Sequence, residues 1–326
     1  KDSQSLEDWA RTLPSPETEI VTLGTGSALP SKYRNVSATL VRVPDHGSYL
    51  FDCGENTLGQ LKRVFRPSEM PNILRELRGI WISHMHADHH LGTVSVIKAW
   101  YEAVHGSQPA NPPVSTTLRS GVSIDADKFP ASKHLAVVSD AAMLHWLAEY
   151  SQVEDYGYSR IAPLAITSAK WTEDESIPSV LRWAHASTPF TELDRAAYPA
   201  VLGLSDIQAV SVSHCHGAKA VTLTFPTGLK VSYSGDCRPS KNFAKIGKGT
   251  TVLIHEATFD DELQGDAVAK KHSTTSEALA IGAAMRAKAV VLTHFSQRYQ
   301  KIPIMETVED GEAAGGAETA GAEFVD

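Results

Sequence analysis

Hydrophobic and polar positions follow two different periods along most of the chain, which predicts strands that alternate with helices. In the first third, short apolar runs predict four strands, at 20–27 (IVTLGTGS), 38–43 (ATLVRV), 48–55 (SYLFDCGE) and 77–83 (LRGIWIS). Apolar residues at helical spacing predict helices at 57–65 and 91–104.

The remainder of the chain continues this pattern. A strand and a helix are predicted at 135–139 and 140–152, and five further runs predict strands at 207–214, 220–225, 229–236, 251–258 and 287–294. A helix is predicted at 274–287, where Thr274 and Glu277 have the spacing of a capping box. This order favours a layered α/β domain with two mixed sheets covered by helices.

Three segments lack a sustained period. Residues 1–18 are polar with prolines and have the character of a linker, 105–134 predict a long loop or insertion, and 305–326 predict an acidic disordered tail. One domain at 19–304 therefore accounts for most of the chain, a length that can bury a core of ordinary density.

Composition and charge restrict the function only weakly. No apolar stretch reaches the roughly 18 residues of a membrane helix, and no signal peptide is recognisable. Three widely spaced cysteines do not suggest a disulfide framework, so a reducing, intracellular compartment is expected. The net charge is −8, but seven of the 38 acidic residues follow Lys301. The rest is nearly neutral, with 30 basic and 31 acidic residues, so charge does not exclude a nucleic-acid partner.

Five of the predicted strands end in residues that bind metals. These residues are His84, His214, Asp236, the pair His255 and Glu256, and His294. Strand ends of layered α/β folds gather at one edge, where loops build functional sites on a rigid scaffold. We therefore expect these side chains to lie close together.

The densest cluster, at 82–92 (ISHMHADHHLG), has the form His84-x-His86-x-Asp88-His89. Alternate residues can point at one metal position, and the adjacent Asp88 and His89 at a second. Histidine with carboxylate suits zinc, and the missing ligands can come from the distant His214, Asp236 and His294. Two such metals would activate a water for hydrolysis, often at phosphorus. The alternative is a polar loop rich in histidine.

Other polar residues have weaker signals. Glu256 in 255–259 (HEATF) can orient His272 in 271–277 (KHSTTSE), which could donate a proton to a leaving alkoxide; a polar loop beside a helix start fits equally well. Asp52 either supports the site or forms a plain turn. Three cations could bind RNA phosphates or simply face solvent, namely Lys32, Arg34 and Arg298. We expect no metal or redox role for the three cysteines, Cys53, Cys215 and Cys237.

The cluster at 82–92 resembles that of the metallo-β-lactamase superfamily. Together with 23–41 (LGTGSALPSKYRNVSATLV), 52–61 (DCGENTLGQL) and 294–299 (HFSQRY), it closely resembles tRNase Z, from about residue 23 to residue 302. The resemblance implies a four-layer αββα sandwich and two zinc ions. It also implies cleavage of precursor tRNA after the discriminator nucleotide, by a metal-bound hydroxide, and a nuclear or mitochondrial location.

The resemblance also implies individual roles. His84, His86 and His214 would bind one zinc, and Asp88, His89 and His294 the other, with Asp236 shared. Asp88 would help to activate the water, while His272, oriented by Glu256, would protonate the leaving 3′ oxygen.

One departure from the family concerns the tRNA-binding arm. Short tRNases Z carry it between the residues that correspond to His214 and Asp236, where this chain has only 21 residues, nearly all of them in two predicted strands. Long tRNases Z carry the arm in an N-terminal half without metal motifs. We therefore expect a catalytic half of a long form, with the other half as partner.

Two other functions remain open at this stage. One is a hydrolase of the same fold that acts on a small phosphodiester or thioester. The other is an inactive, metal-stabilised scaffold that binds RNA or a protein. The presence of Asp88, His272 and Glu256 favours an active enzyme.

Overall fold

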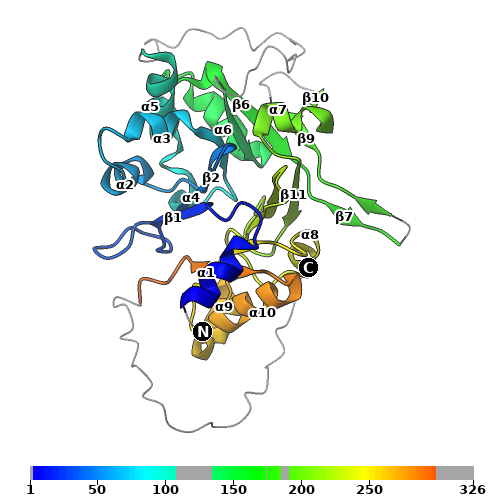
Figure 1. Ribbon diagram of the computed structural model, residues 1–326. Coiled ribbons are helices and arrows are strands. Elements are labelled where there is room, and N and C mark those ends of the chain that lie inside the picture. The colour runs from blue at the N-terminus through cyan, green and yellow to red at the C-terminus, as the bar shows by residue number, and fades with distance from the viewer. Residues whose placement is uncertain (1–2, 108–133, 174, 185–190, 299–326) are drawn as a thin grey trace, which may run out of the picture.

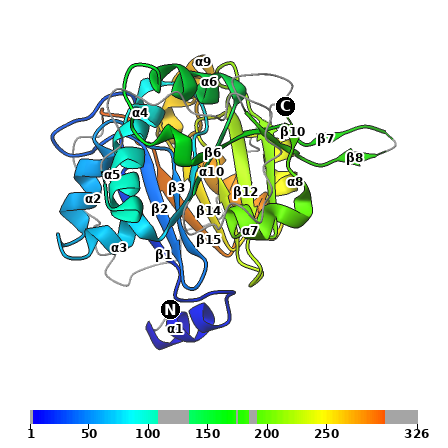
Figure 2. The same cartoon turned by 90° about the horizontal axis from the view of Figure 1, so that it is seen from above.

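Two mixed β-sheets face each other in the computed structural model, and helices cover their outer sides (Figures 1 and 2). The structure describes residues 3–107, 134–173, 175–184 and 191–298. The predicted loop at 105–134 lies mostly, and the predicted tail at 305–326 entirely, outside these residues. The predicted α/β sandwich with two mixed sheets is confirmed.

The larger sheet has eight strands in the order β1-β2-β3-β4-β5-β6-β9-β10. Their bounds are β1 Glu19–Gly24, β2 Ala38–Val43, β3 Gly47–Phe51, β4 Leu77–Trp81, β5 Leu135–Ser139, β6 Ile161–Ile166, β9 Leu181–Trp183 and β10 Thr191–Glu192. Strands β3 to β6 run parallel to one another. Their carboxyl ends therefore point to the same edge of the sheet.

The smaller sheet has five strands in the order β11-β12-β13-β14-β15. Their bounds are β11 Asp206–Ser211, β12 Lys219–Thr224, β13 Lys230–Tyr233, β14 Val252–Glu256 and β15 Ala289–Thr293. The last three are parallel, so the segments that follow β13, β14 and β15 leave the sheet at one edge. All five were predicted from the apolar runs.

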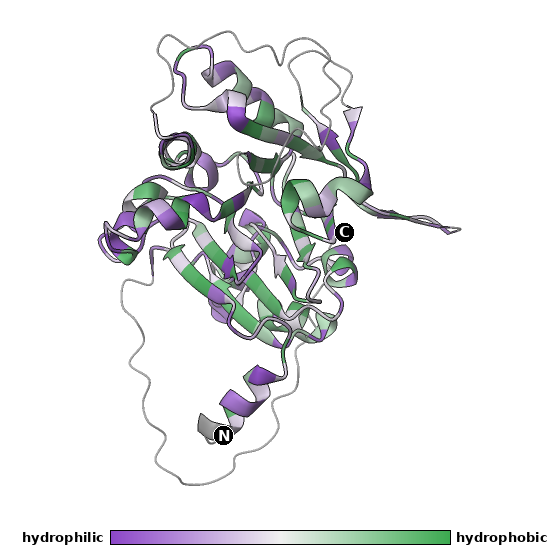
Figure 3. Ribbon diagram, turned by 45° about the horizontal axis from the view of Figure 1, so that its top comes forward, coloured by the Kyte–Doolittle hydropathy of each residue, from purple (hydrophilic) through white to green (hydrophobic). Residues whose placement is uncertain are grey.

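Helices pack on the outer side of each sheet and leave the inner faces to form the core. The larger sheet carries α2 (Thr57–Val64), α3 (Met70–Arg75), α5 (Thr93–His105) and α6 (Ala141–Tyr150), and the smaller carries α8 (Lys241–Ile246) and α10 (Thr275–Met285). The predicted capping box of Thr274 and Glu277 begins α10. Hydrophobic residues are concentrated along the strands, while the helices carry polar residues on their outer surfaces (Figure 3).

Several elements were not predicted. Residues 1–18 contain α1 (Ser3–Arg11), where a linker was expected, and this helix stands off the body of the protein (Figure 2). The short helices α3, α4 (Ala87–His90), α7 (Tyr198–Leu202), α8 and α9 (Gln264–Lys270) were missed, as were strands β6, β9 and β10. A hairpin of β7 (Lys170–Trp171) and β8 (Ser176–Ile177) projects from the body in both views.

Aromatic side chains join the two inner faces of the sandwich. The ring of Phe225, at the end of β12, meets that of Tyr49 on β3 edge to face, with 5.0 Å between centroids. Phe51 on β3 and Tyr233 on β13 form a second pair, 5.3 Å apart. This packing fixes the relative position of the two sheets, and therefore of the loops at their common edge.

Replacing Phe225, which is only 1% exposed, tests that packing. We expect Phe225→Ala to lower the free energy of unfolding by about 3–5 kcal/mol, because the cavity lies between the sheets. Val153→Ala, at a residue that is 78% exposed, should change it by less than about 0.5 kcal/mol. Denaturant unfolding measures both; equal stability of the two variants would contradict the packing role of Phe225.

Candidate metal centre

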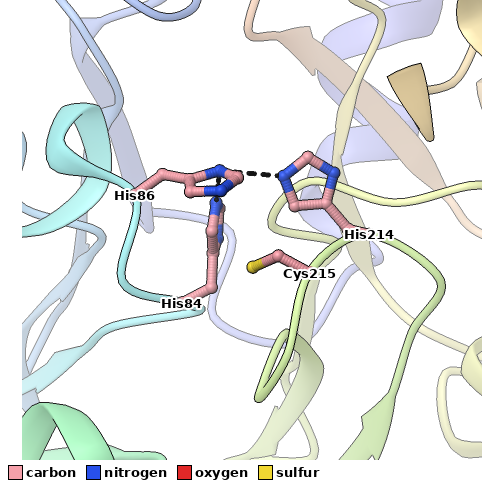
Figure 4. Close-up of side chains that lie close together, drawn as sticks. All are labelled: His84, His86, His214 and Cys215. Carbon is pink, nitrogen blue, oxygen red and sulfur yellow. Dashed lines mark hydrogen bonds between the residues drawn. The ribbon is translucent and has the colours of Figure 1, made fainter.

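Two loops, one after β4 and one after β11, bring three imidazole nitrogens to one point. His84 Nε2 and His214 Nε2 each lie 3.0 Å from His86 Nδ1. Figure 4 shows His84 and His86 leaving the β4 loop and His214 approaching from the loop after β11. One imidazole nitrogen has a single lone pair or a single hydrogen, so His86 Nδ1 cannot form good hydrogen bonds with both neighbours.

A second group of acceptors lies beside the first. His89 Nε2 is 3.3 Å from His294 Nε2, and Asp88 Oδ2 is 3.5 and 3.4 Å from these two atoms. Asp88 and His89 belong to α4, and His294 follows β15. Segments about 200 residues apart in the sequence therefore meet at the shared edge of the sheets.

Asp236 connects the two groups. Its Oδ2 is 3.7 and 3.6 Å from the Nε2 atoms of His84 and His214, and 3.2 and 3.3 Å from those of His89 and His294. Its Oδ1 is buried and has no hydrogen-bond partner among the described residues. A buried carboxylate oxygen without a donor is costly, and a metal ion satisfies it.

Neighbouring groups determine which imidazole nitrogens carry hydrogen. His214 Nδ1 donates to the carbonyl of Lys271 at 3.0 Å, and His89 Nδ1 donates to Asp52 Oδ2 at 2.6 Å. In the neutral form, the Nε2 atom of each of these histidines is then a bare acceptor that faces the cluster. Such partners fix the tautomer of metal-binding histidines and increase their basicity.

The ionisation of these groups favours a cation. Burial raises the pKa of Asp236, but the charges of His294 and His89 outweigh burial and hold it well below its usual value. Burial also raises the pKa of Asp88, but its hydrogen bond to His294 and the charge of His89 outweigh burial and lower this pKa. Both carboxylates are therefore ionised. Burial lowers the pKa of His214, which leaves its imidazole neutral. Burial lowers the pKa of His89, but the charges of Asp236 and Asp52 outweigh burial and raise it well above its usual value, so a bound zinc ion would replace the proton of this imidazole.

Asp52 supports the cluster through hydrogen bonds to several of its neighbours. It is fully buried and accepts hydrogen bonds from the backbone and side chain of Ser83, at 2.7 and 2.8 Å, and from Tyr233 at 2.6 Å, in addition to His89. Its φ is +55°, an uncommon conformation that persists only where the surroundings enforce it. Two roles were open for Asp52, support of the site and a plain turn. The geometry favours support of the site.

Backbone close to the cluster also departs from ordinary conformations. His294 has a φ of +59° and Ala28 one of +65°, and the Ala28 N–H donates to Asp88 Oδ2 at 2.7 Å. Gly54 follows Asp52, and a Cβ there would lie 2.2 Å from the carbonyl oxygen of Asp88. Strained residues of this kind cluster at functional sites.

Glu256 and His272 lie beside the metal-binding residues. His272 Nδ1 is 2.9 Å from Glu256 Oε1, and the carboxylate also accepts from the backbone of Cys237 at 2.7 Å and of Ser273 at 3.0 Å. Burial lowers the pKa of His272, but the charge of Glu256 and its hydrogen bond outweigh burial and raise it to about 9. Because Nδ1 donates to Glu256, the protonated ring keeps an Nε2 hydrogen to give away.

A cavity of about 450 Å³ opens over these residues. His86, Asp88, His214, Asp236, His272 and His294 line it, together with residues that the sequence analysis missed, which are Ser27, Phe259, Lys270 and Gln297. Lys270 and Lys271 form a basic pair directly before His272. This pair was a sequence signal for a cation at the site. A cavity lined by metal-binding residues, a proton donor and a cation can accept an anionic ester.

The three cations proposed from the sequence do not belong to the lining of this cavity. Among the described residues, Arg298 is half exposed and forms an ion pair with Asp266 at 2.8 Å. Arg34 donates to Thr25 at 3.0 Å and covers the ring of Phe295, while Lys32 is exposed beside Tyr33. Their part in binding stays a prediction.

Arg238 ties the loops of the site together, and no sequence signal identified it. Its buried guanidinium donates to the carbonyl of His272 at 2.6 Å and to Glu277 at 2.7 Å. Its backbone N–H donates to Ser213, the neighbour of His214. Arg238 itself lies two residues after Asp236, so one residue, through its side chain and its backbone, links three loops.

Comparisons with known proteins agree with this geometry. The fold is that of metallo-β-lactamase fold proteins, and one of them, YhfI from Bacillus subtilis, has a TM-score of 0.52 at 18% identity, with 86% of each chain covered. A family model described as "Anti-Pycsar protein Apyc1" matches residues 18–103.

More similar proteins narrow the class. Human zinc phosphodiesterase ELAC protein 2 is 35% identical over 312 residues, which are 92% of this chain and 34% of that protein. The structure of a long form RNase Z from yeast is 31% identical, with a TM-score of 0.68, and covers 90% of this chain and 39% of that one. The chain is a homologue of the ribonuclease Z and tRNase Z proteins. This confirms the predicted resemblance. The chain spans about a third of the length of the curated relatives it matches.

Removing the Arg238 guanidinium should weaken the fold around the site. We expect Arg238→Met to lower the free energy of unfolding by about 3–5 kcal/mol, because Glu277 is left as a buried, unpaired charge. Lys98→Met removes the partly exposed pair with Glu154 and should cost less than about 1 kcal/mol. Equal effects in denaturant unfolding would show that Arg238 is no more than a surface cation.

Proposed function

We propose that residues 19–304 form a zinc-dependent endoribonuclease domain. It cleaves the 3′ trailer from precursor tRNA after the discriminator nucleotide and leaves a 3′ hydroxyl on the tRNA. The observation that carries this proposal is the convergence of imidazole nitrogens and carboxylate oxygens from seven side chains, five of which line one cavity. The names of the relatives, which include ribonuclease Z, tRNase Z and zinc phosphodiesterase, support it.

The proposed zinc positions follow the two groups of acceptors. His84, His86 and His214 provide the first, Asp88, His89 and His294 the second, and Asp236 is shared. When bound, two zinc ions supply Lewis-acid stabilisation of the phosphoryl oxygens and lower the pKa of a water. The remaining steps belong to side chains of the protein.

Asp88 and His272 carry the proton transfers in this proposal. Asp88 Oδ2, fixed by the Ala28 N–H, orients the attacking water and accepts its hydrogen bond. His272 gives its Nε2 proton to the 3′ oxygen that leaves, while Glu256 holds the ring through Nδ1 and stabilises its charge. Lys270, in the lining of the cavity, neutralises a non-bridging phosphate oxygen.

Recognition of the whole tRNA needs surfaces outside the cavity. We propose that Lys32, Arg34 and Arg298 contact the RNA backbone, and that a protein part corresponding to the rest of the relatives carries the tRNA-binding arm. Between His214 and Asp236 the chain forms only β12, β13 and their turns, which leave no room for such an arm. This part of the proposal concerns affinity and not the cleavage step.

Substrate choice provides the overall test of this function. The purified chain with zinc should cleave a precursor tRNA at one position, after the discriminator nucleotide, as mapped from the product ends. Rapid turnover of a small chromogenic phosphodiester together with an uncut precursor tRNA would favour a small-molecule hydrolase instead.

Substitution of the two proton-transfer residues should reduce cleavage without unfolding the protein. We expect His272→Ala and Asp88→Ala each to lower the single-turnover rate by about 10²- to 10⁴-fold. His145→Ala, at an exposed histidine of α6, should retain the full rate. Full activity in both test variants, with zinc content unchanged, would refute their assignment.

Loss of the Asp52 carboxylate should weaken metal binding from a distance. We expect Asp52→Asn to lower zinc affinity by about 10- to 100-fold, because His89 Nδ1 loses its charged acceptor. Affinity is measured by competition with a chromogenic chelator, and unfolding in the presence of chelator separates this effect from stability. Unchanged affinity would show that Asp52 supports only the fold.

A further inference from the structure

The thiol of Cys215 lies against the first proposed zinc position. Its Sγ is within 4.8 Å of the ligand nitrogens of His84, His86 and His214 (Figure 4), and all four ligand atoms lie within this distance of one another. The hydrogen bond from Sγ to the carbonyl of His216 is 3.7 Å long, so the thiol is only weakly engaged elsewhere.

The other two cysteines do not share this environment. Cys53 and Cys237 are fully buried, and neither belongs to a group of metal-binding side chains among the described residues. Cys215 is partly exposed and follows His214 directly. The position of its sulfur is therefore specific to this site.

The shared carboxylate lies farther from the first metal position than from the second. Asp236 Oδ2 lies 3.2 and 3.3 Å from the nitrogens of the second position, but 3.7 and 3.6 Å from His84 and His214 of the first. Asp236 thus leans toward the second position. Three imidazoles and the more distant Asp236 oxygen leave room at the first position for a further protein ligand.

We propose that Cys215, as a thiolate, is a further protein ligand at the first metal position, beside the three imidazoles. Zinc binds imidazole nitrogen at about 2.0–2.1 Å and thiolate at about 2.3 Å, which places tetrahedral donors roughly 3.4–3.6 Å apart. Donors already within 4.8 Å reach these separations by small side-chain rotations. On binding, the Sγ–H bond breaks, the proton passes to solvent, and the sulfur lone pair forms the bond to the metal.

This ligand gives the site a preference among metals. Thiolate is a soft ligand that favours zinc, whereas manganese prefers oxygen ligands. A His₃Cys set at the first position, beside an Asp-rich second position, therefore selects zinc over manganese at the first position. The inference rests on the metal centre of the proposed function and assigns a residue to it that we had not expected to bind metal.

Cobalt provides a direct test because its thiolate complexes absorb in the near ultraviolet by charge transfer. The cobalt-loaded protein should show this thiolate band, and Cys215→Ser should lose it. Cys53→Ala and Cys237→Ala, which remove the other two thiols in turn, should keep it. In parallel, zinc should slow the alkylation of Cys215 in the wild-type protein.

The cobalt content of each sample distinguishes the possible failures. Bound cobalt without a thiolate band, or a band that survives in Cys215→Ser, would overturn the role of Cys215 and leave the metal centre intact. A wild-type chain that binds no cobalt and no zinc would overturn both proposals. If Cys215→Ser binds no cobalt, zinc protection of the wild-type thiol decides: protected Cys215 supports ligation, and unchanged alkylation excludes it.

Discussion

Like acceptors that face one another in a buried place require a positive charge between them. At the common edge of the two sheets, the Asp236 carboxylate meets the nitrogens of His84, His89, His214 and His294 at 3.2–3.7 Å. For His89 and His214, hydrogen bonds on the opposite nitrogen direct a lone pair toward this point. Without a metal ion, only a proton could supply this charge: burial lowers the pKa of His89, but Asp236 and Asp52 raise it well above its usual value. The buried Asp236 Oδ1 would still have no partner among the described residues.

The fold brings these imidazoles and carboxylates together at one edge of the two sheets. Parallel strands in both sheets deliver their carboxyl ends to one edge, and aromatic pairs across the core hold the sheets in register with each other. Asp52, at a positive φ, and the buried Arg238 then position the loops. The strained backbone of Asp52 and the buried ion pair of Arg238 both support the site. Asp52 accepts a hydrogen bond from the proposed ligand His89, and Arg238 donates one to the carbonyl of His272, the proposed proton donor.

Much of this site was predicted from the sequence, because strong local patterns mark the strands and the residues that follow them. Apolar runs that end in His or Asp predicted β4, β11, β13, β14 and β15, and the parallel arrangement explains why their ends meet. Strands of two or three residues such as β7 and β9 have too few positions to show a period, and α1 was hidden in a polar segment. Arg238 acts through long-range contacts that no local pattern reveals, whereas Lys270 belongs to a basic pair at 270–271 that the sequence does display. Cys215 resembled any small apolar residue until its three histidine neighbours were known.

The most direct test of this account is the location of bound metal by anomalous scattering at the zinc absorption edge, in crystals grown with zinc. Two peaks are expected roughly 3.5–4 Å apart, on either side of Asp236, with His86 and His214 at one peak and His89 and His294 at the other. Peaks bound by other residues, or no peak within reach of Asp236, would contradict it.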